Sequence, residues 1–120
     1  MTWDEIRKDY LVLSRTFIMA RRDSINLHLV KYAMNLIEDM ITGYPFQDNT
    51  GRDILQLGDE RELLYSRIIL NKTMEQTAEY LSVSRDTAYR LSRTIKANNN
   101  IPQGILIEYL KTKEKLKDVL

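Results

Sequence analysis

Two helix N-caps stand one short helix apart in this sequence, and this spacing constrains the fold more than any other feature. Thr73, with Gln76 three residues later, has the form of a capping box. Ser84 is a preferred N-cap residue and precedes the helix-forming run RDTAYRLSRTIK. The segment between the caps, MEQTAEYL, is long enough for about two helical turns. We therefore expect residues 72–91 to form a short helix, a tight turn and a second helix that crosses the first.

The residue types between these caps are those that a helix-turn-helix needs. A small residue is expected where the helices cross, apolar residues beside the turn, a small residue in the turn, and small and apolar residues on the inner side of the second helix. The residues in these places are Ala78, Leu81, Ser82, Val83, Ala88 and Leu91. Thr77 is the exception, since a larger apolar residue is more usual there, and its hydroxyl is expected to bond back to a carbonyl.

The N-terminal part has helical periodicity. Thr2 and Glu5 form a second capping-box pattern, and Trp3, Ile6, Tyr10, Leu13 and Phe17 then recur at helical spacing. After a break at 20–24, residues 25–41 carry apolar side chains on two faces, which indicates a helix central in a bundle or shared between subunits. Residues 24–42 and the tail are therefore both candidate dimer surfaces.

Glycine and proline in 42–51 and 101–104 mark loops, and Asp59 with Glu62 has the form of a third capping box. Residues 105–120 form a last amphipathic pattern with lysines on its polar side. We predict an all-α fold of about six helices. Its parts are an N-terminal helical pair at 1–44, a loop at 45–57, a helix-turn-helix unit at 58–98 and a C-terminal helix at 103–120.

Composition and charge exclude several classes of function. The chain of 120 residues has no cysteine, and its formal net charge is +1. No apolar run approaches the ~18–20 residues of a membrane span, and the N-terminus has no apolar leader, so we expect a cytoplasmic protein without a membrane partner. We find no nucleophile motif and no phosphate loop, and therefore predict no enzyme, catalytic residue or cofactor.

Two further features have simple structural interpretations. His28, the single histidine, is expected to be a core or interface residue rather than a metal ligand. Residues 48–62 hold five acids, but these lack the regular ligand spacing of a calcium loop. We interpret them as solvated charge and helix caps (Asp48, Asp53, Asp59, Glu60 and Glu62), and predict no metal site.

The second helix of the motif has a surface suited to DNA. Residues 84–96 contain four basic residues and one acid. Arginine can bind guanine through two hydrogen bonds, threonine can contact a thymine methyl group, and hydroxyl and basic side chains suit phosphates. We predict that Arg85, Thr87 and Arg90 contact bases. The remaining predicted DNA-binding residues are Ser84, Asp86, Tyr89, Arg93 and Lys96.

Residues 59–97 also resemble a known family. The run ERELLYSRIILNKTMEQTAEYLSVSRDTAYRLSRTIK is similar to the helix-turn-helix of region four of bacterial sigma factors. It is more similar to small phage and prophage late-gene regulators of the RinA and ArpU type. The matching residues are Glu60-Arg61-Glu62, Val83-Ser84, Thr87-Ala88-Tyr89-Arg90 and Arg93. The resemblance implies promoter binding and activation of late or packaging genes, with recognition residues Arg85, Asp86, Thr87, Tyr89 and Arg90.

The sequence thus predicts a sequence-specific regulator of phage or mobile-element type that binds double-stranded DNA. A single reader of this size makes few phosphate contacts, so a homodimer is expected. One alternative is a helical interaction module that contacts RNA polymerase, a sigma factor or another regulator. A second is a DNA-packaging adaptor similar to a small terminase subunit.

Overall fold

A computed structural model describes residues 1–19, 27–44 and 54–120, and every regular element among them is helical. This confirms the predicted all-α fold. In chain order the elements are α1 (Trp3–Met19), α2 (Leu27–Thr42), α3 (Ile54–Leu64), η1 (Tyr65–Ile69), α4 (Met74–Leu81), α5 (Arg85–Asn98) and α6 (Gln103–Glu114). The element η1 is a turn of π-helix that continues directly from α3. No helix in the described ranges is both long and apolar enough to cross a bilayer.

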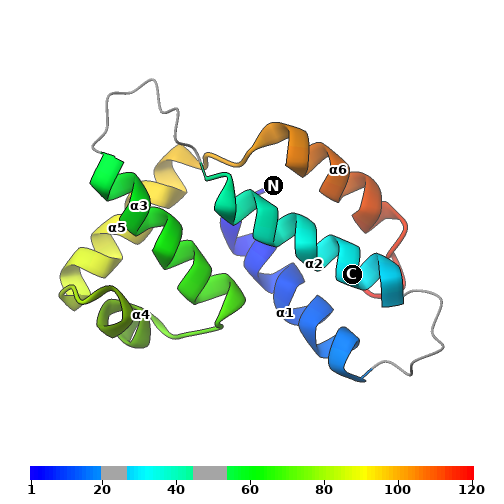
Figure 1. The fold of residues 1–120 in the computed structure, drawn as a ribbon, viewed down its shortest axis with the longest axis horizontal. Coiled ribbons are helices and arrows are strands. Elements are labelled where there is room, and N and C mark those ends of the chain that lie inside the picture. Colours follow the sequence, from blue (N-terminus) through cyan, green and yellow to red (C-terminus); the bar gives the residue numbers. More distant parts are fainter. Residues whose placement is uncertain (20–26, 45–53) are drawn as a thin grey trace.

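The helices form two groups that lie side by side in an elongated molecule of 45 × 30 × 17 Å (Figure 1). One group consists of α1, α2 and α6, so the last helix returns to the N-terminal pair. The other consists of α3, α4 and α5. The junction is made by α1 packing on η1 and by α2 packing on α3 and η1. The helix-turn-helix unit is therefore mounted on a three-helix bundle.

Helix α2 is the central helix of this bundle. It packs against α1 on one side and α6 on the other, and its apolar residues on both faces are buried. Burial on two sides explains why residues 25–41 show apolar side chains all round. The apolar surface of α2 is thus used within one chain, and the described part of residues 24–42 offers little for a partner.

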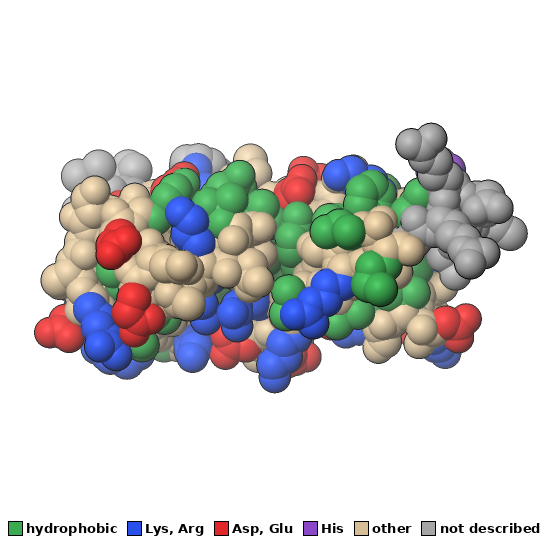
Figure 2. Space-filling view, turned by 90° about the horizontal axis from the view of Figure 1, so that it is seen from below, with side chains coloured by type: hydrophobic (Ala, Val, Ile, Leu, Met, Phe, Trp, Pro, Cys, Tyr) green, Lys and Arg blue, Asp and Glu red, His purple; other side chains and the backbone are tan. Residues whose placement is uncertain are grey.

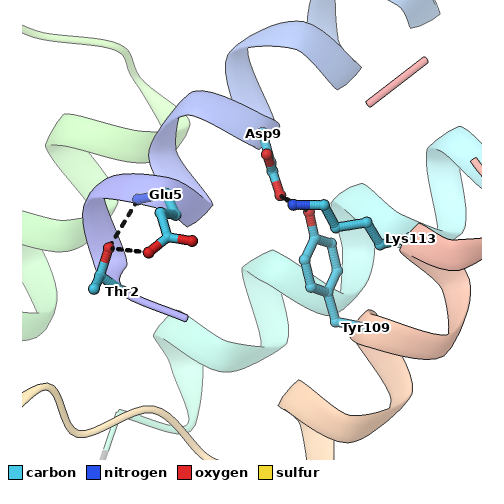
Figure 3. Close-up of polar contacts among 5 residues, drawn as sticks. All are labelled: Thr2, Glu5, Asp9, Tyr109 and Lys113. Atoms are coloured by element: carbon cyan, nitrogen blue, oxygen red, sulfur yellow. Dashed lines mark hydrogen bonds and ion pairs between the residues drawn. The ribbon is translucent and has the colours of Figure 1, made fainter. Parts of the chain in front are cut away.

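A carboxylate links the first and last helices of the bundle. Asp9 of α1 accepts a hydrogen bond from the Tyr109 hydroxyl at 2.6 Å and pairs with the Lys113 ammonium at 2.8 Å (Figure 3). Tyr109 is fully buried, and its burial, followed by the bond to Asp9, raises the pKa of its hydroxyl far above the usual value. The tail therefore packs on the chain through a specific polar contact as well as through apolar burial.

The predicted capping box at the N-terminus is confirmed in part. The Thr2 hydroxyl accepts from the Glu5 amide at 3.2 Å, and it lies 3.1 Å from the Glu5 carboxylate, to which it donates (Figure 3). In a full capping box the Glu5 carboxylate would accept from the Thr2 backbone amide instead. Thr2 thus begins α1 as predicted.

The third predicted capping box is wrong. Helix α3 begins at Ile54, so Asp59 lies inside the helix. Glu60 is not solvated, because it is fully buried and accepts a hydrogen bond from the Tyr44 hydroxyl at 3.0 Å. Asp59 and Glu62 are exposed, while Asp48 and Asp53 lie outside the described residues. His28 was predicted to be a core or interface residue; it is exposed on α2, so it is not part of the core, and a role at an interface stays a prediction.

Candidate nucleic-acid interface

The turn between α4 and α5 has the tight geometry that the sequence predicted. Thr73 begins α4 with a complete capping box. The helix ends at Ser82, whose φ of 56° is left-handed. The amides of Ser82 and Val83 donate to the carbonyls of Glu79 and Ala78, each at 3.0 Å. This pair of bonds forms a Schellman motif, which reverses the chain within a few residues and sends it into α5.

Thr77 sits in the core of the motif, but among the described residues its hydroxyl bonds to another hydroxyl and not to a carbonyl. Thr77 is fully buried and shares a hydrogen bond of 2.9 Å with the hydroxyl of Ser66, which is equally buried. The expected backbone bond is therefore replaced by a contact between α4 and η1. Two hydroxyls satisfy each other where an apolar residue would otherwise be expected.

Helix α5 has one buried and one exposed face. Its inner side consists of Ala88, Leu91 and Ile95, and each of these side chains is at most 2% exposed. The helix packs with this side against α3 and α4. Most of the predicted DNA-binding residues point away from this core. Arg85, Asp86, Arg90, Arg93 and Lys96 are exposed, whereas Thr87 and Tyr89 are half-buried.

The N-terminus of α5 is held by two of the predicted site residues. The Ser84 hydroxyl accepts from the Thr87 amide at 3.1 Å and donates to the Thr87 hydroxyl at 2.9 Å. Ser84 is thus confirmed as the N-cap. Both hydroxyls are engaged with each other, and the Thr87 methyl group remains the part of that side chain suited to an apolar contact.

The outer surface of α5 is hollowed beside its first turns. Arg85, Asp86, Tyr89 and Arg93 line a shallow depression of about 400 Å³. The Arg85 guanidinium lies 5.5 Å from the centre of the Tyr89 ring and 3.3 Å from the Glu75 carboxylate of α4. Both partners of that ion pair are largely exposed, so water and salt screen their attraction. The ion pair therefore orients the Arg85 side chain but holds it only weakly.

Other basic residues on this helix have fewer partners. Lys96 lies 3.6 Å from Asp4 at the start of α1, with both side chains exposed. Within residues 1–19, 27–44 and 54–120, neither Arg90 nor Arg93 forms an ion pair. Figure 2 shows Lys and Arg side chains along the lower edge of one face, from the end that carries the helix-turn-helix unit towards the middle, with some acidic side chains among them.

Two arginines from other elements reach the same region, and the sequence pattern did not identify them. Arg7 of α1 and Arg67 of η1 line a cleft with Tyr89, Arg93 and Lys96 of α5. The Arg7 Nε donates to the Arg67 carbonyl at 3.3 Å. No local signal could have found these residues, since α1 meets α5 only through the tertiary fold.

The described residues contain no group of three or more histidine, cysteine or acidic side chains that could hold a metal ion. The side chains on the outer face of α5 include cations, hydroxyl groups and one aromatic ring, which suit phosphates and base edges, and one carboxylate, that of Asp86. No family model, curated protein or solved structure matches this chain.

Proposed function

We propose that this protein is a regulator of transcription that binds double-stranded DNA in a sequence-specific manner, with α5 in the major groove. One observation carries the proposal. The α5 helix buries one side on α3 and α4 and presents four basic side chains outward. It follows a tight turn, and the residues at its N-terminus are exposed to solvent. Helix-turn-helix proteins place the first residues of such a helix against base edges.

The residues divide into two groups along α5. Arg85, Thr87 and Arg90 lie in the first turns, where base edges are within reach, and Arg90 has the most freedom because no ion pair holds it among the described residues. Tyr89, Arg93 and Lys96 suit the flanking phosphates. The N-terminal end of the helix adds a partial positive charge that favours a nearby phosphate.

Two copies acting together would extend this small surface. A single α5 offers few phosphate contacts, and dimers of helix-turn-helix proteins bind two half-sites. Because α2 is buried within the chain, the candidate dimer surface is the outer side of α6, where Ile107 is 54% and Leu110 is 45% exposed. The link to phage late-gene regulators is part of the same proposal and rests on the resemblance of residues 59–97.

The test is a fluorescence-anisotropy titration with random-sequence duplex DNA at two salt concentrations. It compares the wild type with the triple variant Arg85→Ala, Arg90→Ala, Arg93→Ala. The matched control replaces Lys8, Arg15 and Lys31, which are exposed on the bundle, by alanine and removes the same charge. We expect the α5 variant to lose at least about tenfold in affinity.

The control should bind like the wild type. If both triple variants lose the same affinity, the attraction is a property of net charge and α5 is not the reader. If the folded wild type does not bind at low salt, DNA is not the ligand. A pull-down of RNA polymerase without DNA would then test the interaction module.

A further inference from the structure

A cleft lies at the junction between the bundle and the helix-turn-helix unit. It has a volume of about 290 Å³ and is formed by α1, the end of α3 with η1, the start of α4, and α5. Its floor is apolar, with Leu63, Leu64 and Ile68 among the residues that line it. Ligand sites favour such junctions, and this volume is at the small end of the usual range of about 300–1,000 Å³.

The rim of the cleft is strongly basic. Arg7 comes from α1, Arg67 from η1, and Arg93 and Lys96 from α5, whereas Asp4 is the one acid in the lining. Asp4 lies 3.6 Å from Lys96, and both side chains are exposed. Among the described residues no carboxylate forms an ion pair with any of the three arginines. The cleft therefore has an excess of positive charge.

Backbone carbonyls, and not carboxylates, accept hydrogen bonds from the side chains of Arg7 and Arg67. The Arg7 Nε donates to the carbonyl of Arg67, and the Arg67 guanidinium donates to the carbonyl of Lys72. Burial, followed by the charge of Arg7, lowers the pKa of Arg67. Two guanidinium groups that face the same partly buried space repel each other, and an anion between them would relieve this repulsion.

Two aromatic residues complete the lining. The Trp3 side chain is 4% exposed, and its Nε1 has no hydrogen-bond acceptor among the described residues. A buried donor that is left unsatisfied is destabilising. Tyr89 lines the same cleft from α5 and offers a ring on which a flat group can stack. The cleft thus combines cations with two aromatic side chains, one of which carries an unsatisfied buried donor.

We propose that this cleft binds a small phosphate monoester that carries a flat ring, with the phosphate between Arg7, Arg67 and Arg93. Guanidinium groups match the geometry of a phosphate. A site with several of them suits the double negative charge of a phosphate monoester better than the single charge of a carboxylate. The apolar floor and Tyr89 would hold the ring. This site extends beyond the proposed DNA-binding surface of α5, because Arg7 belongs to α1 and Arg67 to η1.

The test uses adenosine monophosphate as the probe, with inorganic phosphate and uncharged adenosine beside it. Isothermal titration calorimetry on the full chain, without DNA, measures the affinity. Trp3 is the single tryptophan, so a change in its fluorescence locates the ligand at the cleft. We expect saturable binding of adenosine monophosphate, weaker binding of phosphate and none of adenosine. The absence of heat with either anion up to about 10 mM would overturn the proposal.

Two variants and a control assign the site. Arg7→Gln and Arg93→Gln should each weaken binding of adenosine monophosphate at least about tenfold, since a hydrogen bond to a charged group is lost. Arg93 is exposed, so its variant keeps the fold even where Arg7→Gln does not. Arg15→Gln removes the same charge from an exposed position on α1 and should bind like the wild type. Equal losses in all three variants would contradict a defined site.

If α5 also binds DNA, a ligand in the cleft would regulate that binding. This consequence rests on the proposed function. The cleft and the DNA-facing surface share Tyr89, Arg93 and Lys96. A phosphate monoester in the cleft should therefore weaken DNA binding. Calorimetry without DNA tests the cleft alone, so failure of either proposal can be recognised separately. Full DNA binding with the cleft saturated would exclude the regulatory link and leave the anion site in place.

Discussion

Ser82 holds the turn before α5 in a conformation that glycine adopts more easily. Its φ is 56°, and non-glycine residues in this region are strained by about 1–2 kcal/mol. No side-chain hydrogen bond compensates for this strain among the described residues. The turn nevertheless forms because both Schellman bonds and the burial of Ala78 support it. A residue that adopts this conformation without strain should therefore stabilise the protein.

We predict that Ser82→Gly raises the free energy of unfolding by about 1 kcal/mol, because glycine has no Cβ to clash at positive φ. The same substitution at Ser92, inside α5, should lower the free energy of unfolding by about 1 kcal/mol, since glycine in the interior of a helix is destabilising. Urea unfolding followed by circular dichroism measures both variants. A loss of stability in Ser82→Gly would show that the serine side chain contributes to the turn.

Individual residues also show where sequence reasoning reaches its limit. The caps at Thr73 and Ser84 were predictable, because a cap depends on a hydrogen bond to a residue three positions away. The Ser66–Thr77 bond and the burial of Glu60 were not, because each depends on a partner from another element. The approach of Arg7 to α5 was hidden for the same reason.

At the scale of elements, the helices were predictable from their periodicity, but two boundaries were not. The C-terminal helix was predicted at 103–120, whereas α6 ends at Glu114. Asp59 with Glu62 has the form of a capping box, yet α3 runs through both from Ile54. A Cβ at Gly58 would meet no atom within 4 Å, so the glycine marks neither a turn nor a close approach. The packing of α3 on α5 outweighs the unfavourable effect of a glycine inside a helix.

The contact between α1 and α6 gives a prediction at this scale. Asp9→Ala leaves the buried Tyr109 hydroxyl without its acceptor, which should lower the free energy of unfolding by about 1–3 kcal/mol. Asp39→Ala is the matched control, because Asp39 is exposed on α2 and should change stability by less than about 0.5 kcal/mol. Thermal unfolding monitored at 222 nm distinguishes them. Equal melting temperatures would mean that α6 docks through apolar contacts alone.

Two of the bundle's tyrosines predict how stability depends on pH. Burial, followed by the charge of Glu38, raises the pKa of Tyr10 to about 12. The pKa of Tyr109 is also raised, by burial and by Asp9. The unfolded chain loses these protons near the ordinary tyrosine pKa of 10.0, while the folded chain still holds them. Stability should therefore be complete below pH 10 and should fall as the pH rises towards 12.

Urea unfolding at a series of alkaline pH values tests this prediction. The Tyr10→Phe variant removes one of the two protons, so its stability should fall less steeply between pH 10 and 12 than that of the wild type. The hydroxyl bond to Glu38 is lost in this variant, which lowers stability at every pH but leaves the slope as the informative quantity. Parallel curves for the two proteins would contradict the assignment of Tyr10.

The whole molecule is nearly neutral, and its positive charge is concentrated rather than spread. The net charge is +1, yet the single helix α5 carries four basic residues. We therefore expect weak general attraction to DNA, so the salt dependence of the proposed binding would report the contacts of α5 itself. The logarithm of the binding constant falls with the logarithm of salt concentration by about 0.9 per neutralised phosphate. The slope thus counts how many copies of α5 reach the DNA.

Arg93 and Lys96 are the two cations proposed to contact phosphates, so one copy should give a slope of about −1.8 and two copies about −3.6. Because we propose a dimer, we expect the steeper value for specific duplex DNA. Anisotropy titrations from about 50 to 200 mM salt measure it. Arg93→Ala should then reduce the slope by about 1.8, since one phosphate contact is lost from each copy. A slope near −1.8 that changes by about 0.9 in this variant would mean that one chain binds alone, and that the exposed residues of α6 serve another purpose.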